Sequence, residues 1–170
     1  SSSFSICKIL WLIANEPESY EKTRWFMSPA DFVVSRMTGQ LGITDYTNAL
    51  KMGYDLVEDK WPSWVRDYSG LSERLPNVVA PGTQIGMVQT RSSRMSYLPE
   101  GLPVLAGATD STAAFLASGA TRVGDENSTL GSTLVVKRLC SCIIGDRDGR
   151  CYSHKLPDNR WLLGAASNVG

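Results

Sequence analysis

The chain has 170 residues, of which 42% are hydrophobic, and its 17 basic and 17 acidic side chains cancel to a formal net charge of zero. This length and composition allow a buried core, arranged as one domain or as two small pieces. A balanced charge gives no field that would attract nucleic acid, and the apolar run over residues 9–14 is too short to cross a membrane. We therefore expect neither nucleic acid nor a membrane as a partner.

The first part of the chain predicts three helices. An apolar helix over residues 6–14 ends before Pro17, because proline interrupts a helix, and a more polar helical stretch follows up to Lys22. The third helix begins at the run Ser28-Pro-Ala-Asp31, which has the residues of a capping box with proline at the first helical position. Gly39 ends that helix, since glycine readily adopts the left-handed conformation found at helix C-termini.

The next stretch, up to residue 88, predicts loops and short elements. Residues 42–48 are turn-rich. Asp45 and Asn48 in this loop could face a polyhydroxylated substrate, but such side chains usually cap their own backbone, so neither is included in the site. A further helix is expected over residues 61–70 and a β hairpin over residues 75–88, where prolines and glycines punctuate short apolar runs.

A short strand and a helix meet at an acidic residue beyond the middle of the chain. Residues 104–106 form an apolar run typical of a buried central strand that enters a turn, and glycine follows them. Asp110 then occupies the position expected for a helix N-cap, ahead of small helix-forming residues and of Gly119 at the far end. By itself this pattern has two readings. The carboxylate either satisfies free amides of the first helical turn or takes part in chemistry at the mouth of the helix.

The last part of the chain predicts β structure. Residues 129–133 should form a turn between two strands, in which Gly131 lets the backbone approach an anion and the hydroxyls of Ser132 and Thr133 donate to phosphate oxygens. Taken alone, the same tripeptide is an ordinary hairpin turn. The expected strands cover residues 132–136, 139–144 and 151–154, with a tight turn at Asp148-Gly149.

Four cysteines and one histidine raise the question of a metal site. Cys140 and Cys142 are separated by one residue, a spacing that fits no common zinc motif, and His154 precedes a proline in a polar segment. We therefore expect no metal ligand set and interpret the cysteines, including Cys7 and Cys151, as reduced thiols of an intracellular protein. A single histidine also gives little support to a Ser-His-Asp hydrolase.

A set of short motifs, in a fixed order along the chain, carries a family resemblance. Two of them surround the residues discussed above and are Gly107-Ala-Thr-Asp110 with Ala113-Ala114, and Thr129-Leu-Gly-Ser-Thr133. The others lie upstream and are Trp11, Asn15-Glu-Pro-Glu18, Ser28-Pro-Ala-Asp31, Arg36-Met-Thr-Gly39 and Asp45-Tyr-Thr-Asn-Ala49. These motifs resemble those of the FGGY carbohydrate kinases, in the branch of the ribulose and xylulose kinases. Residues 161–170 are similar to the same family, in which a strand meets a glycine-rich turn.

The resemblance implies an α/β fold of the actin-like, ribonuclease-H-like ATPase type, with two lobes and a cleft. Residues 1–117 would be the C-terminal part of the N-terminal lobe, and residues 118–170 the beginning of the C-terminal lobe. The family's first phosphate motif and its glycine-rich adenosine motif are not found in these residues. We therefore expect the chain to be the middle of a longer kinase and to be inactive alone.

The resemblance also implies roles for individual residues. Asp110 would be the general base that orients a sugar hydroxyl and accepts its proton during phosphoryl transfer, a role worth roughly 10²- to 10⁴-fold in rate. Gly131, Ser132 and Thr133 occupy the family's Gly-Thr-Ser position, with the two hydroxyl residues in the opposite order, and would contact the phosphates of ATP. Mg²⁺ would be held largely by those phosphates and by water.

Two alternatives stay open from the sequence. The small-molecule substrate could be another polyol, such as glycerol or a hexulose, because the sugar-contacting side chains lie mostly outside the matched motifs. The chain could also belong to a non-catalytic protein that uses the same fold for binding or as a scaffold. The expected compartment is intracellular, either cytoplasm or plastid, and no oligomeric state is predicted.

Overall fold

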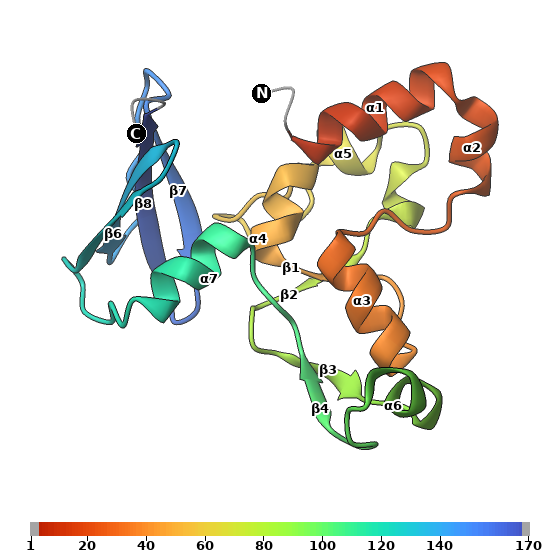
Figure 1. Cartoon of the computed structure of the whole chain (residues 1–170). Helices are drawn as coiled ribbons and strands as arrows, with labels where there is room; N and C mark the ends of the chain where they lie inside the picture. Colours follow the sequence, from red (N-terminus) through yellow and green to blue (C-terminus); the bar gives the residue numbers. More distant parts are fainter. Residues whose placement is uncertain (1–3, 168–170) are drawn as a thin grey trace. The chain divides into compact units, whose positions relative to one another are not determined.

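The first two helices form where the sequence predicts them. In the computed structural model, which describes residues 4–167, α1 runs over Ser5–Asn15 and α2 over Pro17–Lys22 (Figure 1). Ile6 and Ile9 are buried on one face of α1, which is the amphipathic arrangement of a helix at the surface of a domain. Among the described residues, no helix is long and apolar enough to cross a membrane.

Helix α3 (Pro29–Thr38) begins with the predicted capping box. The hydroxyl of Ser28 accepts a hydrogen bond from the Asp31 amide at 3.2 Å, and the Ser28 amide donates to Asp31 Oδ2 at 2.8 Å. Gly39 follows in the left-handed conformation, with φ of 76°, and its amide donates to the Ser35 carbonyl. Local contacts therefore satisfy backbone groups at both ends of this helix.

The prediction of a loop at residues 42–48 is wrong, because this segment forms strand β1 (Ile43–Asp45) and helix α4 (Tyr46–Ala49). Asp45 is 2% exposed, and its Oδ1 accepts hydrogen bonds from the backbone amides two and three residues further on, at 2.8 and 3.2 Å. Polar residues that are typical of a loop cap a short buried helix here.

Two short pairs of strands replace the β hairpin predicted over residues 75–88. Strand β2 (Asn77–Val79) pairs in parallel with β1, and β3 (Gln84–Met87) pairs antiparallel with β4 (Pro103–Leu105). Each strand thus finds a partner that is distant in the sequence, and a local turn signal does not specify such a partner. The central position predicted for the strand at 104–106 is wrong, since β4 belongs to a two-stranded sheet and Leu105 is 51% exposed.

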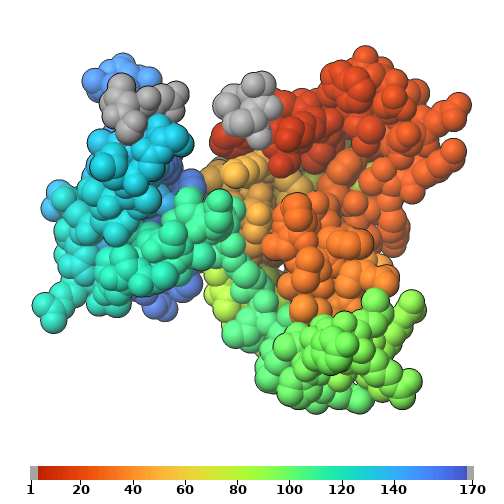
Figure 2. Space-filling view, viewed as in Figure 1, coloured from red at the N-terminus to blue at the C-terminus, as the bar shows by residue number. Residues whose placement is uncertain are grey.

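Short helical segments complete the first part of the chain. They are η1 (Leu50–Met52), α5 (Ser63–Arg66), η2 (Leu71–Arg74) and α6 (Thr90–Ser96). The helix predicted over residues 61–70 is therefore shorter than expected, and Trp61 packs edge-on against Tyr54 with ring centroids 5.0 Å apart. In the space-filling view α6 (green) lies against α3 (orange), where Ser92 Oγ donates to the Arg36 carbonyl at 2.6 Å (Figure 2).

A four-stranded antiparallel sheet follows helix α7 (Asp110–Ala117). Its strands are β5 (Glu126–Leu130), β6 (Leu134–Cys140), β7 (Cys151–Leu156) and β8 (Arg160–Ser167), in the order β5-β6-β8-β7 (Figure 1). The two strands predicted over residues 132–144 are one strand, β6. The turn at Gly149 is confirmed, since its amide donates to the Asp146 carbonyl at 3.1 Å.

Strand β8 passes through Gly164, where the resemblance implies a strand followed by a glycine-rich turn. Residues 168–170 of that segment lie outside the described residues. Gly164 is needed inside the strand because a Cβ at this position would collide with the ring of Tyr152 on β7. The glycine therefore admits an aromatic ring rather than forming a turn.

An apolar cluster holds α7 on the sheet. Phe115 packs with Leu139, Leu156 and Leu162, and each of these four side chains is 1% exposed. Gly119, just beyond the helix, has φ of 79° and donates to the Leu116 carbonyl at 3.2 Å, as predicted for the residue that ends it. The helix that carries Asp110 is thus fixed by its C-terminal half.

The chain divides into two compact units, Ser1–Gly107 and Ala108–Gly170. The second unit contains α7 and the antiparallel sheet, and the first contains the other helices and the two strand pairs. The division into family lobes, 1–117 and 118–170, stays a prediction.

Candidate functional site

Asp110 is the first residue of α7, and its side chain is exposed. The N-cap is Thr109 and not Asp110 as predicted, because Thr109 is extended and its carbonyl already accepts the amides of Thr112 and Ala113 at 3.0 and 2.9 Å. Asp110 Oδ1 accepts a hydrogen bond from the Ser111 amide at 2.7 Å. Its second oxygen, Oδ2, accepts no hydrogen bond from any residue that the structure describes, so it is available to a ligand.

Two polar contacts tie the N-terminal half of α7 to the sheet. Thr112 Oγ1 lies 3.4 Å from Nδ1 of His154 on β7, and the ammonium of Lys137 on β6 donates to the Ser111 carbonyl. Thr109, the N-cap residue, makes no side-chain capping bond. The backbone that carries the carboxylate is therefore positioned from the sheet and not by a cap of its own.

The site predicted from the sequence does not include Lys137. The structure buries this lysine, which is 5% exposed. Burial lowers the pKa of its ammonium below the usual value, and the negative charge of Asp110 acts in the opposite direction. The alternation of buried and exposed residues along β6 indicates this burial. Val135, Lys137 and Leu139 share the face that packs on α7, since Leu139 contacts Phe115. A lysine among such residues indicates a buried charge.

The predicted phosphate-binding residues form the turn between β5 and β6, which confirms the expected turn between strands. Gly131 and Ser132 are exposed, and Thr133 is partly exposed. The Gly131 amide donates to the Thr133 carbonyl at 3.2 Å, so this amide is already used inside the turn. The hydroxyls of Ser132 and Thr133 make no hydrogen bond to a residue within 4–167 and can donate to an anion.

The structure places the predicted base and the predicted phosphate contacts in the same unit without joining them. Within the part of the chain that is described, no hydrogen bond or ion pair links Asp110 to Gly131, Ser132 or Thr133. The two groups lie at the start of α7 and at the β5–β6 turn. Their roles stay predictions.

Cys140 is a buried free thiol, Cys151 a partly exposed one and Cys142 an exposed one, and Cys7 is exposed. Among the described residues, no three His, Cys, Asp or Glu side chains are gathered so that they could hold a metal ion. His154 instead contacts the Tyr152 ring, with centroids 5.1 Å apart. Cys7 lies on α1, whereas Cys140 and Cys151 lie on strands β6 and β7, and in the part of the chain that is described these thiols form no shared ligand set with His154.

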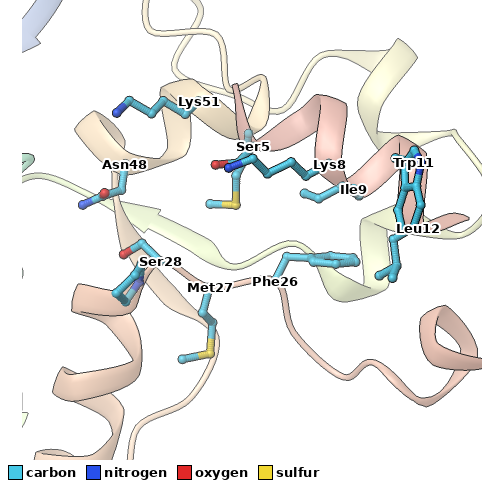
Figure 3. A pocket seen from close by; sticks show the side chains of 12 residues that line it. Ser5, Lys8, Ile9, Trp11, Leu12, Phe26, Met27, Ser28, Asn48 and Lys51 are labelled. Carbon is cyan, nitrogen blue, oxygen red and sulfur yellow. The ribbon is translucent and has the colours of Figure 1, made fainter. Parts of the chain in front are cut away.

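The first unit contains a pocket of about 480 Å³ between α1, the α4–η1 segment and the start of α3. Lys8, Asn48 and Lys51 gather at one end of it in Figure 3. The Asn48 side-chain amide donates to Asp45 Oδ2 at 2.5 Å, which fixes its orientation. The apolar part of the lining consists of Ile9, Trp11, Leu12, Phe26 and Met27. Asn48, which the prediction left out of the site, thus borders a space suited to a ligand with oxygen acceptors.

Comparison with known proteins accounts for most of the sequence. Residues 1–117 match the N-terminal domain of the FGGY family of carbohydrate kinases. A xylulose kinase of Lactococcus lactis subsp. lactis (strain IL1403) is 26% identical over 171 residues, which cover 98% of this chain and 34% of the relative. An L-fuculokinase of Salmonella typhi is 30% identical over 118 residues, which cover 68% of this chain and 25% of the relative.

Solved structures share the fold. The crystal structure of xylulose kinase from Rhodospirillum rubrum matches with a TM-score of 0.84 at 23% sequence identity, covering 98% of this chain and 34% of that one. The likeness confirms the predicted α/β fold of the actin-like ATPase type, of which the chain contains a part. The chain spans about a third of the length of the first of these curated relatives, 34%.

Proposed function

Because this chain belongs to the FGGY family of carbohydrate kinases, we propose that the full-length protein containing it transfers a phosphoryl group from ATP to a sugar hydroxyl. The acceptor is a pentulose, D-ribulose or D-xylulose, and similarity to a xylulose kinase over nearly the whole chain supports this class of substrate. The observation that carries the proposal is the exposed Asp110 carboxylate, which has one oxygen held by a backbone amide and the other available.

Asp110 acts as the general base in this proposal. A sugar hydroxyl is a weak nucleophile, and a carboxylate within hydrogen-bond reach can orient it and take its proton as the bond to phosphorus forms. The Ser111 amide holds Oδ1 at 2.7 Å and so limits the rotation of the carboxylate. Oδ2 is the atom that accepts the proton.

Ser132 and Thr133 contact the ATP phosphates in this proposal, with Gly131 beside them. The residues fit an anion because the turn is exposed and carries two available hydroxyls. A Cβ added at Gly131 would meet the Thr133 carbonyl at 3.9 Å and no nearer atom, so the backbone here is open to an approaching phosphate. The Gly131 amide itself is bonded within the turn and contributes less than the resemblance implies.

Mg²⁺, when bound, neutralises charge that develops on the transferred phosphoryl group. Residues 4–167 contain no cluster of three side chains able to ligate a metal ion. In our proposal the ion is therefore carried by phosphate oxygens and water, as is common for Mg²⁺ in phosphoryl transfer.

Turnover of the full-length protein with ATP and each pentulose tests the proposal. Asp110→Asn should keep the fold and lower turnover by about 10²- to 10⁴-fold, the range for loss of a general base. Asp148→Asn is the matched control, since Asp148 is an exposed aspartate of the same unit that pairs with Arg150 at 2.9 Å, and its turnover should equal that of the wild type. Near-normal turnover of Asp110→Asn would remove Asp110 from the mechanism.

Calorimetric titration separates a kinase from a non-catalytic protein of the same fold. The full-length protein should bind a pentulose and a nonhydrolysable ATP analogue, each with a measurable heat. A protein that binds neither would be a scaffold, and the proposed transfer would then be excluded.

Similarity to an L-fuculokinase favours a second candidate, in which the same chemistry acts on a different sugar or polyol. A panel that includes both pentuloses, L-fuculose and glycerol would rank these acceptors by kcat/KM. A highest value for L-fuculose or glycerol would overturn the pentulose assignment and leave the kinase assignment in place.

A further inference from the structure

Lys137 carries a buried charge that the proposed reaction does not account for. It is 5% exposed, and its ammonium forms no ion pair with any residue that the structure describes. The ammonium instead donates a hydrogen bond to the carbonyl of Ser111, which is a neutral acceptor. An apolar side chain could fill the same space without the desolvation of a charge. The charge at this position therefore needs an explanation beyond packing.

The strand neighbours of Lys137 do not supply a counter-charge. Its cross-strand partners are Asn127 on β5 and Gly164 on β8, and Gly164 pairs in turn with Tyr152 on β7. Tyr152 reaches over Gly164, and burial raises the pKa of its phenol, which keeps the ring neutral. The sheet thus surrounds the lysine with an amide, a glycine and an uncharged ring.

The negative charge that acts on Lys137 comes from α7. Asp110 precedes Ser111, whose carbonyl accepts the lysine ammonium, and its carboxylate favours the charged form of the lysine. The other titratable groups that face this end of the helix are Tyr152 and His154 on β7. Glu126 and Arg138 lie on the opposite face of the sheet, where they pair with each other at 3.6 Å.

We propose that Lys137 is a positioning residue for Asp110, because its ammonium donates to the Ser111 carbonyl and so holds the first turn of α7, which carries the carboxylate. The inference rests on the proposed function, since it assigns Lys137 to the same reaction. Lys137 does not touch the sugar. It acts through a helix turn without a side-chain cap, whose position would otherwise depend on contacts further along α7.

Two variants of the full-length protein separate charge from hydrogen bonding. Lys137→Met removes both, whereas Lys137→Gln keeps a donor for the Ser111 carbonyl and removes the charge. We expect Lys137→Met to lower kcat about 10- to 100-fold, which is part of the contribution of a general base, with KM for the sugar changed less than about threefold. Lys137→Gln should show a smaller loss of kcat, because its side-chain amide can still donate to the Ser111 carbonyl.

Arg138→Met is the matched control, because Arg138 is the next residue of β6 and points to the other face. Its kcat and KM should match those of the wild type. A Lys137→Met variant with wild-type kcat would overturn the inference. So would a loss of activity that lies entirely in KM, because a positioning role predicts a loss in kcat.

A double variant shows whether Lys137 acts through Asp110. Lys137→Met added to Asp110→Asn should lower the residual kcat by less than about twofold, since residues that act as a unit are not additive. Full additivity would overturn the inference while the proposed function stands. If Asp110→Asn keeps wild-type activity, Asp110 is not the base and the inference about Lys137 fails with that assignment, while the proposed phosphoryl transfer stands.

Discussion

The two compact units hold their helices in different ways. In the first, α3 and α4 are capped by residues next to them in the sequence, Ser28 with Asp31 and Asp45 with the amides just beyond it. In the second, α7 has no side-chain cap and is tied to the sheet by Lys137 and His154, which lie 26 and 42 residues from their partners. Local contacts therefore cap α3 and α4, whereas contacts between distant residues place the candidate base.

This difference predicts where substitutions matter most. Where capping side chains accept the free backbone amides of a helix, each cap contributes about 1–2 kcal/mol to stability. A helix held by packing depends on one apolar side chain, whose removal leaves a cavity. Three comparisons between variants test this contrast, from the largest expected effect to the smallest.

Phe115→Ala should destabilise the second unit by about 3–5 kcal/mol, because it removes the side chain through which α7 packs on the sheet. Hydrogen exchange of the full-length protein would show the loss as reduced protection in residues 108–167. Leu116→Ala is the control, since Leu116 is on the same helix but 44% exposed, and it should change stability by less than about 1 kcal/mol. Equal losses for both variants would mean that α7 is not held by this cluster.

Asp45→Ala should destabilise the first unit by about 1–3 kcal/mol, because it leaves buried backbone amides at the start of α4 without an acceptor. Asp55 offers a matched control. Its Oδ1 accepts the amides of Val57 and Glu58 at 2.9 and 3.0 Å in the same local pattern, but those amides reach solvent. Asp55→Ala should cost less than about 1 kcal/mol by the same exchange measurement. Equal losses of stability in Asp45→Ala and Asp55→Ala would mean that burial of the capped amides makes no difference, and would contradict the contrast between the units.

The contrast also explains how far the fold could be predicted from the sequence. The capping box of α3 was identified because Ser28, Asp31 and Gly39 act within one helix. The loop at residues 42–48 was a wrong prediction for a related reason. The expected backbone capping is confirmed for Asp45, whereas the Asn48 side chain donates to the Asp45 carboxylate. The segment after Asp45 is a buried helix, and its burial depends on residues elsewhere in the chain.

The candidate site shows the same limit. The exposed Asp110 and the β5–β6 turn could be predicted, because a family resemblance marks them and turn residues have local signatures. Thr109 took the N-cap position because the helix starts one residue earlier than its small-residue pattern indicates. Lys137 was missed, since its partner on α7 lies 26 residues away and strand pairing decides which face it occupies. Recognising an inward lysine would have required the register of β6, which the sequence predicted as part of two strands.

The smallest expected effect is the pH dependence of stability. It compares the carboxylates of Asp31 and Asp55, which both lie in the first unit. Burial raises the pKa of Asp31 above its ordinary 3.8, against the hydrogen bond from the Ser28 amide. The folded state then binds more protons than the unfolded state between 3.8 and the raised value, so this contribution to stability is lost as the pH rises through that window. Asp55 behaves in the opposite way, because the amides of Glu58 and Val57 lower its pKa, and its contribution is lost as the pH falls.

Denaturation of the wild type, Asp31→Asn and Asp55→Asn from acid to neutral pH measures both contributions. The stability difference between wild type and Asp31→Asn should decrease with rising pH, because the introduced amide keeps an acceptor for the Ser28 backbone but does not titrate. The difference between wild type and Asp55→Asn should increase over the same range. Opposite slopes would show that burial dominates one aspartate and local amides the other, within a single unit. Slopes of the same sign would mean that Asp31 is stabilised as an anion by its capping box, so that local contacts outweigh burial even in the interior of this unit.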